Sequence, residues 1–149
     1  MADMRQENAR DPHQLERMKE LEEKELCFFC DKNYLAVGAS PALFETTWWF
    51  VKESDYPYEG TVRHILIASH AHITRIAELL PEAWMNLKKV LDLVEKSVDA
   101  PGSSIFVRQG DMDYTAATLD HLHFHFILGG RDKNGAQPIK VKLGYEQEK

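Results

Sequence analysis

The segment 121–128, His-Leu-His-Phe-His-Phe-Ile-Leu, constrains the fold more than any other part of the chain. Three histidines stand at a spacing of two and alternate with large apolar residues. Successive side chains of an extended strand point to opposite faces, so His121, His123 and His125 are predicted to share one face. The segment therefore predicts a strand with one reactive face and one face buried in the core, the latter formed by Leu122, Phe124 and Phe126.

The histidine repeat is compatible with more than one kind of chemistry. A neutral imidazole acts near neutral pH as a nucleophile, as an acid or base, and as a metal ligand. One hypothesis is a metal site in which strand histidines bind zinc and activate a water molecule. Another is covalent catalysis, in which one imidazole attacks phosphorus and its neighbours stabilise charge. A third interpretation gives the histidines no role beyond covering a solvated face.

Length and charge limit the class of protein. The 149 residues, 44% of them hydrophobic, suit one globular domain with a sizeable core. The chain has no apolar run of membrane-spanning length and no secretory signal at its start, so we expect a cytoplasmic protein with no membrane partner. A net charge of −6 without a lysine and arginine cluster argues against binding to long nucleic acid. A few donors in a pocket can still hold a single nucleotide.

The two cysteines of the chain, Cys27 and Cys30, stand in the sequence Cys-Phe-Phe-Cys. A lasting disulfide is not expected in a reducing compartment. The pair is then a metal half-site, a redox pair or two buried thiols, and the spacing favours the metal. Two ligands do not complete a zinc site, so two more must come from elsewhere in the chain.

The first 25 residues are rich in charge and differ from the rest of the chain. Asp11 as N-cap, Pro12 at the first helical position and Gln14 three residues after the cap predict the start of a helix. Its apolar stripe is thin, which fits a helix resting on the domain or a dimer contact. We therefore divide the chain into a charged helical extension, 1–25, and a catalytic domain, 26–149.

The remaining pattern predicts strands before and after one long helix. Apolar residues at intervals of three and four predict the helix over 81–98. The order of elements indicates an α+β domain built on a mostly antiparallel sheet. Short apolar runs predict strands at 34–37, 44–46, 48–51, 63–68 and 104–108, and an edge strand at 139–143.

Three segments together resemble the histidine-triad (HIT) family of nucleotide hydrolases and transferases, over roughly residues 27 to 130. Segment 27–30 is similar to the zinc half-site of many members. Segment 56–73 is similar to the family's strand in which a histidine precedes an apolar run, with a second histidine, His72, eight residues on. Segment 110–125 is similar to the triad and its approach loop. The resemblance implies the HIT fold and a homodimer.

The resemblance also implies roles in catalysis. His123 corresponds to the nucleophile that takes a nucleotidyl group from an α-phosphate, and His125 to a phosphate contact. Thr118 stands where members often have a hydroxyl that donates to the phosphate or the leaving group. Gln109 replaces an asparagine near the scissile bond, and Ser54 replaces an acid or amide that holds the ribose, with Asp55 beside it.

A structural Zn²⁺ is implied by the same resemblance. Its ligands in the zinc-bearing members correspond to a Cys₂His₂ set, which suits a closed tetrahedral site. From the residue alone, His64 is also compatible with a core histidine whose hydrogen bonds are satisfied. The predicted ligands are Cys27, Cys30, His64 and His121.

Three functions follow from these patterns. The first is a nucleotidyl hydrolase or transferase acting on a small nucleotide, such as a nucleoside phosphoramidate or a dinucleoside polyphosphate, through a nucleotidyl-histidine intermediate. Attack at phosphorus develops charge on the equatorial oxygens, which requires fixed donors around the phosphate. The second is a HIT module that binds a nucleotide or a partner with little turnover. The third is a metal-dependent hydrolase that uses the triad as ligands.

Overall fold

A computed structural model describes residues 4–149 and contains one five-stranded antiparallel sheet. The strand order is β1-β2-β3-β5-β4. This confirms the predicted α+β class. The strands are β1 (Phe44–Glu45), β2 (Trp49–Glu53), β3 (Arg63–Ser69), β4 (Ser104–Val107) and β5 (His123–Leu128).

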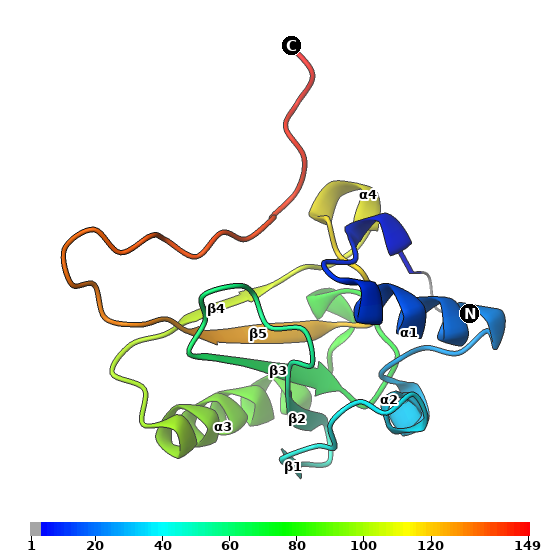
Figure 1. Cartoon of the computed structure of the whole chain (residues 1–149). Helices are drawn as coiled ribbons and strands as arrows, with labels where there is room; N and C mark the ends of the chain where they lie inside the picture. The colour runs from blue at the N-terminus through cyan, green and yellow to red at the C-terminus, as the bar shows by residue number, and fades with distance from the viewer. Residues whose placement is uncertain (1–3) are drawn as a thin grey trace.

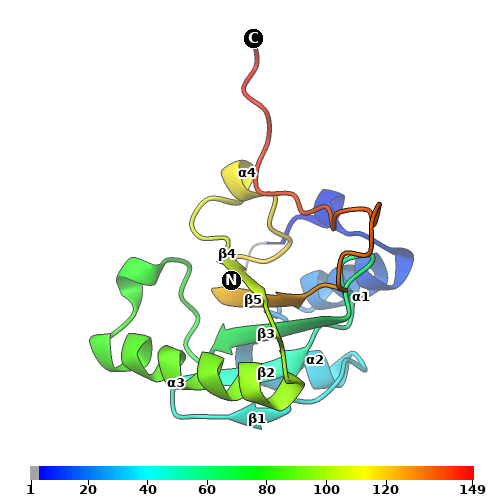
Figure 2. The same cartoon turned by 90° about the vertical axis from the view of Figure 1, so that its left-hand side faces the viewer.

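The helices lie on the two sides of this sheet (Figures 1 and 2). The long helix, α3, covers one face, while α1 and α2 lie on the opposite side. Among the described residues, no helix combines the length and the apolar character needed to cross a membrane. The helices are α1 (Pro12–Glu23), α2 (Asn33–Ala36), α3 (Pro81–Val98) and α4 (Met112–Thr115), with 3₁₀ turns η1 (Gln6–Asn8), η2 (Cys30–Lys32) and η3 (Ile76–Glu78).

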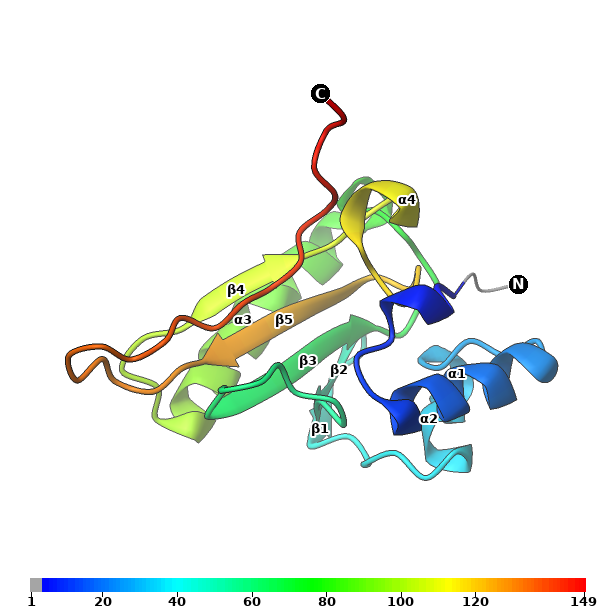
Figure 3. The ribbon, with the colours of Figure 1, turned by 45° about the horizontal axis from the view of Figure 1, so that its top comes forward.

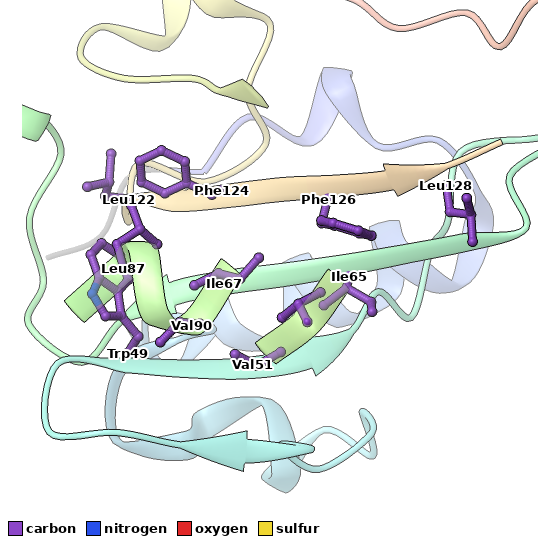
Figure 4. Packing of buried hydrophobic residues seen from close by; sticks show 11 residues of the cluster. Trp49, Val51, Ile65, Ile67, Leu87, Val90, Leu122, Phe124, Phe126 and Leu128 are labelled. Atoms are coloured by element: carbon purple, nitrogen blue, oxygen red, sulfur yellow. The ribbon is translucent and has the colours of Figure 1, made fainter. Parts of the chain in front are cut away.

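The main core lies between α3 and the sheet (Figure 4). Leu87 and Val90 of α3 pack against apolar side chains of the central strands and of the histidine segment. Each such side chain stabilises the fold by about 1.5–3 kcal/mol when fully buried. The apolar half of the predicted alternation is confirmed, because Leu122, Phe124, Phe126 and Leu128 all belong to this core.

The opposite face of the sheet carries the histidines. Antiparallel pairing of β3 with β5 places Leu66 beside His125 and Ala68 beside His123. Leu66 and Ala68 belong to a second apolar cluster, with Phe29, Tyr34 and Phe50, on the side of the sheet away from α3. The triad therefore opens toward the side on which α1 and α2 lie (Figure 3).

The N-terminal helix begins as predicted. The Asp11 carboxylate accepts a hydrogen bond from the Gln14 backbone N–H at 2.9 Å, and Pro12 is the first helical residue. Met18 and Leu21 are buried and pack against the domain. The helix thus rests on the domain, whereas a domain boundary at residue 25 stays a prediction.

Two predicted strands are wrong. Segment 34–37 lies mostly in the short helix α2, because Asp31 and Lys32 adopt left-handed backbone angles (φ 48° and 57°) that turn the chain, and the Tyr34 N–H then bonds to the Phe28 carbonyl. Segment 139–143 forms no strand among the described residues. There the Arg108 side chain donates to the Lys142 carbonyl, with Nε at 3.1 Å, in place of a backbone ladder.

Candidate active site and metal cluster

Four side chains from distant parts of the chain form a compact cluster of metal-binding atoms. Cys27 and Cys30 follow α1, His72 lies in the loop after β3, and His121 precedes β5. Their ligand atoms all lie within 4.8 Å of one another. The Cys27 sulfur is 3.5 Å from the His121 Nδ1, the Cys30 sulfur is 3.3 Å from the His72 Nδ1, and the two Nδ1 atoms are 3.2 Å apart.

These separations suit a tetrahedral ion. Zinc bonds of about 2.3 Å to sulfur and 2.0–2.1 Å to nitrogen require sulfur–nitrogen separations of roughly 3.6 Å and nitrogen–nitrogen separations of roughly 3.4 Å. The Nε2 of His121 lies 2.6 Å from the Ser69 carbonyl. Because a carbonyl only accepts hydrogen bonds, Nε2 carries the proton and Nδ1 presents its lone pair to the cluster. The cluster is therefore able to hold a metal ion.

The protonation of the Cys30 thiol also depends on whether a cation is bound beside it. Burial, followed by the neighbouring Cys27, raises the pKa of Cys30 to about 12. A thiol in this environment stays protonated unless a cation stabilises the thiolate. A divalent ion held by these four groups would supply that positive charge.

The predicted ligand set is corrected at one position, where His72 replaces His64. The β3–β5 register pairs His64 with Ile127, at the far end of β5 from His121. Strand β3 is seven residues long, and His121 bonds to the carbonyl of Ser69 at the end of β3 opposite to His64. A strand rises about 3.3 Å per residue, so His64 lies far beyond ligand distance.

His123 presents an unprotonated nitrogen to a cavity. Its Nδ1 lies 2.7 Å from the His121 carbonyl and donates to it, which leaves the Nε2 lone pair free. The side chain is 8% exposed and lines a cavity on the α1 side of the sheet. Burial lowers the pKa of His123 to about 4, so the imidazole is neutral at neutral pH.

Beside His123, two hydrogen bonds run in one direction from Tyr58 through His64 to His125. The Tyr58 backbone N–H donates to the Nδ1 of His64 at 3.2 Å, so the proton of His64 resides on Nε2. That Nε2 lies 2.9 Å from the Nδ1 of His125 and donates to it. The proton of His125 is consequently held on Nε2, which makes this nitrogen a hydrogen-bond donor.

Burial keeps both histidines of this pair neutral. Desolvation, then the charge of Arg10, lowers the pKa of His64 to about 3. Desolvation also holds the pKa of His125 well below its usual range. The His125 ring stacks on Phe106, with ring centres 4.5 Å apart and an angle of 4° between the planes, which fixes its orientation.

The remaining predicted substrate residues do not all reach the cavity. Thr118, Ser54, His123 and His125 line it together. Gln109 is exposed and does not line it, because its side-chain oxygen accepts a hydrogen bond from the Ile76 N–H at 2.9 Å.

Asp55, next to Ser54, forms an ion pair with a buried lysine, Lys52. The Nζ of Lys52 lies 2.6 Å from one carboxylate oxygen, and the Ser40 N–H donates to the other at 2.8 Å. Burial by itself raises the pKa of Asp55, but hydrogen bonds from Lys52 and Ser40 outweigh it and the net pKa is lowered. Lys52 has no exposed surface, whereas Asp55 also lines the cavity beside Ser54.

Sequence reasoning missed two arginines of this site. Arg10, from the N-terminal extension, and Arg108, just after β4, both line the cavity beside the triad. Arg108 stands at the end of the predicted strand 104–108, where alternation with Phe106 gave a usable signal. Arg10 lies among scattered charges and carries no comparable signal.

No family model and no curated protein matches the sequence. A zinc-bound histidine triad family protein from Mycobacterium smegmatis superposes with a TM-score of 0.51 at 18% identity, over 78% of this chain and 84% of that one. The protein has the histidine-triad fold. At this identity, the similarity to HIT proteins establishes the fold alone. The roles of individual residues are argued from their geometry.

Two further solved structures share the HIT fold. A HIT family hydrolase from Clostridium thermocellum has a TM-score of 0.51 at 20% identity, covering 78% of this chain and 91% of its own. A histidine triad nucleotide-binding protein from Candida albicans has a TM-score of 0.51 at 19% identity, covering 73% and 86%. The HIT fold thus accounts for most of the described chain in each comparison.

Proposed function

We propose that the protein is a nucleotidyl hydrolase or transferase that acts at the α-phosphate of a small nucleotide through a covalent intermediate on His123. The observation that carries the proposal is the hydrogen bond from the Nδ1 of His123 to the His121 carbonyl at 2.7 Å. It leaves a neutral, unprotonated Nε2 in a cavity that also contains His125 and Thr118. The solved HIT proteins named as hydrolase and as nucleotide-binding protein support the choice of substrate class.

The reaction has two steps. The Nε2 lone pair of His123 forms a bond to the α-phosphorus while the bond to the leaving group breaks, and the leaving group keeps that electron pair. His125 Nε2–H donates to a non-bridging oxygen, and the Thr118 hydroxyl donates to the phosphate or the leaving group. Water, or another acceptor, then attacks phosphorus, loses a proton to solvent and releases the nucleotide from His123.

The metal cluster has a structural role in this proposal. A zinc ion held by Cys27, Cys30, His72 and His121 joins the N-terminal loop to the residue that accepts the His123 hydrogen bond. Free thiols in such a site suit a reducing compartment, so we keep the cytoplasm as the proposed location. The chain is further proposed to act as a homodimer.

A second candidate is a HIT module that binds a nucleotide without useful turnover. One observation favours it: Arg10 and Gln14 of the N-terminal extension form part of the wall of the cavity. A wall built by an extension can hold a ligand and slow its exchange. The hypothesis of a triad-bound catalytic metal gains no support, because His121 points its Nδ1 into the cysteine cluster while His123 and His125 use theirs in hydrogen bonds.

Release of AMP from adenosine 5′-phosphoramidate tests the proposal. Wild-type protein is expected to release AMP, while His123→Ala, with an unchanged melting temperature, is expected to lose at least about a thousandfold in kcat/KM. A matched control is His70→Ala, which changes an exposed histidine outside this cavity. Nucleotide binding without any AMP release by the wild type supports the binding module instead.

A further inference from the structure

Two arginines that are far apart in the sequence lie against one aromatic ring at the edge of the active site. The guanidinium carbon of Arg10 lies 4.5 Å from the centre of the Tyr58 ring, and that of Arg108 lies 5.9 Å from it. Arg108 also donates from Nη1 to the Tyr58 hydroxyl at 2.9 Å. The two positive charges are therefore held close together.

Neither charge is neutralised within the described part of the chain. Residues 4–149 place no carboxylate within 4 Å of either guanidinium. Arg10 donates only to a neutral group, the Tyr56 carbonyl at 2.7 Å, and Arg108 donates to neutral groups as well. Arg10 is exposed and Arg108 is half-buried, and two like charges held close together without a counter-charge create a positive potential that attracts an anion.

The donors of this region converge on one space. The hydrogen-bond chain from Tyr58 through His64 places a proton on the Nε2 of His125, and the Nη1 of Arg108 lies 3.4 Å from that nitrogen. Two donors cannot bond to each other, but an acceptor placed beside this pair of nitrogens can accept a hydrogen bond from both. A phosphate oxygen is such an acceptor.

A second cavity continues from the first on the other side of the arginines. It has a volume of about 340 Å³ and shares Arg10, Arg108 and Ala116 with the cavity over His123. Its wall adds two lysines of the C-terminal segment, Lys140 and Lys142, and contains no acidic side chain. Four cationic residues thus line this second cavity, and two of them also line the cavity over His123.

We propose that this cationic cavity binds the phosphates that lie beyond the α-phosphate. The inference rests on the proposed nucleotidyl chemistry and narrows its substrate class. The substrate is then a nucleotide whose α-phosphate is joined to one or more further phosphates, and the leaving group is a phosphate or polyphosphate anion. Arg10 and the two lysines are specificity-determining residues, because they contact the charged leaving group and leave the neutral parts of the substrate untouched.

The test compares the affinities of AMP and adenosine 5′-(α,β-methylene)diphosphate by isothermal titration calorimetry. The two probes share the nucleoside and differ by one further phosphate on a bond that resists cleavage. Wild-type protein is expected to bind the methylene diphosphate about tenfold or more tightly than AMP. In Arg10→Gln and in Lys140→Gln/Lys142→Gln, the ratio of the two dissociation constants is expected to fall toward one.

The control variant is Lys89→Gln/Lys96→Gln, which removes the same charge from exposed positions on α3. It is expected to retain the wild-type ratio, whereas an equal fall in this variant contradicts a local subsite. A wild-type ratio near one, with AMP bound and adenosine 5′-phosphoramidate cleaved, overturns the subsite and leaves the proposed function standing. Failure to bind either nucleotide overturns both.

Discussion

The Nε2 of His64 lies 2.9 Å from the Nδ1 of His125, and the Tyr58 backbone N–H occupies the other nitrogen of His64. A backbone amide can only donate, so the direction of both hydrogen bonds is fixed. His64 therefore acts as a positioning residue that sets which nitrogen of His125 carries its proton. His64 is buried, with 2% exposure, and the hydrogen bond from His123 to the His121 carbonyl does not involve it.

Replacement of His64 is expected to impair turnover more than substrate binding. His64→Ala removes the donor to His125 and should lower kcat by about a hundredfold while changing KM less. His64→Gln offers an amide N–H and a carbonyl oxygen, and it should recover part of the loss. Steady-state kinetics on adenosine 5′-phosphoramidate measure both variants. Equal kcat values for the alanine and glutamine variants contradict a role in orienting a proton.

The metal cluster predicts which histidine holds zinc. Protein purified with zinc is expected to contain about one ion per chain, and His72→Ala is expected to lose most of it and to melt at a lower temperature. His64→Ala should keep the ion, because His64 pairs with Ile127 at the other end of the strands. Elemental analysis of both variants decides between the ligands. Zinc retained in His72→Ala and lost in His64→Ala reverses the assignment.

The buried histidine pair predicts how stability depends on pH. Burial lowers the pKa of folded His64 from its ordinary value of 6.5 to about 3, so the unfolded chain binds more protons between these pH values. The free energy of unfolding then falls as pH drops below about 6.5, by up to about 1.4 kcal/mol per pH unit for each such histidine. The measurement is denaturant unfolding of the wild type and of His64→Gln over the range from about pH 7 to about pH 4. An equal slope in both proteins excludes His64 as a source.

The ion pair between buried Lys52 and Asp55 predicts a stability effect at Asp55. Asp55→Ala leaves Lys52 buried without its partner and should lower the free energy of unfolding by about 3–5 kcal/mol. The double variant Lys52→Met/Asp55→Ala should recover much of that loss. Ser54→Ala serves as the neighbouring control and should change stability little. A higher KM without loss of stability in Asp55→Ala instead indicates a carboxylate that holds the substrate.

Periodicity in the sequence predicted the parts of the fold that local patterns determine. The alternation around Phe124 and the helix over 81–98 were predicted because one face of each element had to be buried. The capped start of α1 at Asp11 was predicted because its hydrogen bond lies within one turn. Segment 34–37 was not, since left-handed residues upstream turn the chain before its apolar run can extend.

The site was harder to predict because its partners come from strand register. The spacing of His64 and His72 along the chain does not reveal that β3 runs antiparallel to β5, and only this register brings the later histidine to His121. Arg10 meets Arg108 because the extension folds back over the sheet, which no local pattern records. His123, by contrast, was singled out by its place in the triad, and the structure shows that it lines a cavity.

The most direct test of the central claim is the mass of the protein during turnover. Samples quenched in the steady state with adenosine 5′-phosphoramidate are analysed by intact-mass spectrometry, and the modified peptide is then sequenced. We expect an adenylyl group on His123 in the wild-type protein and no adduct in His123→Asn. Rapid AMP release with no adduct under any quenching condition, or an adduct on His125, contradicts nucleophilic catalysis by His123.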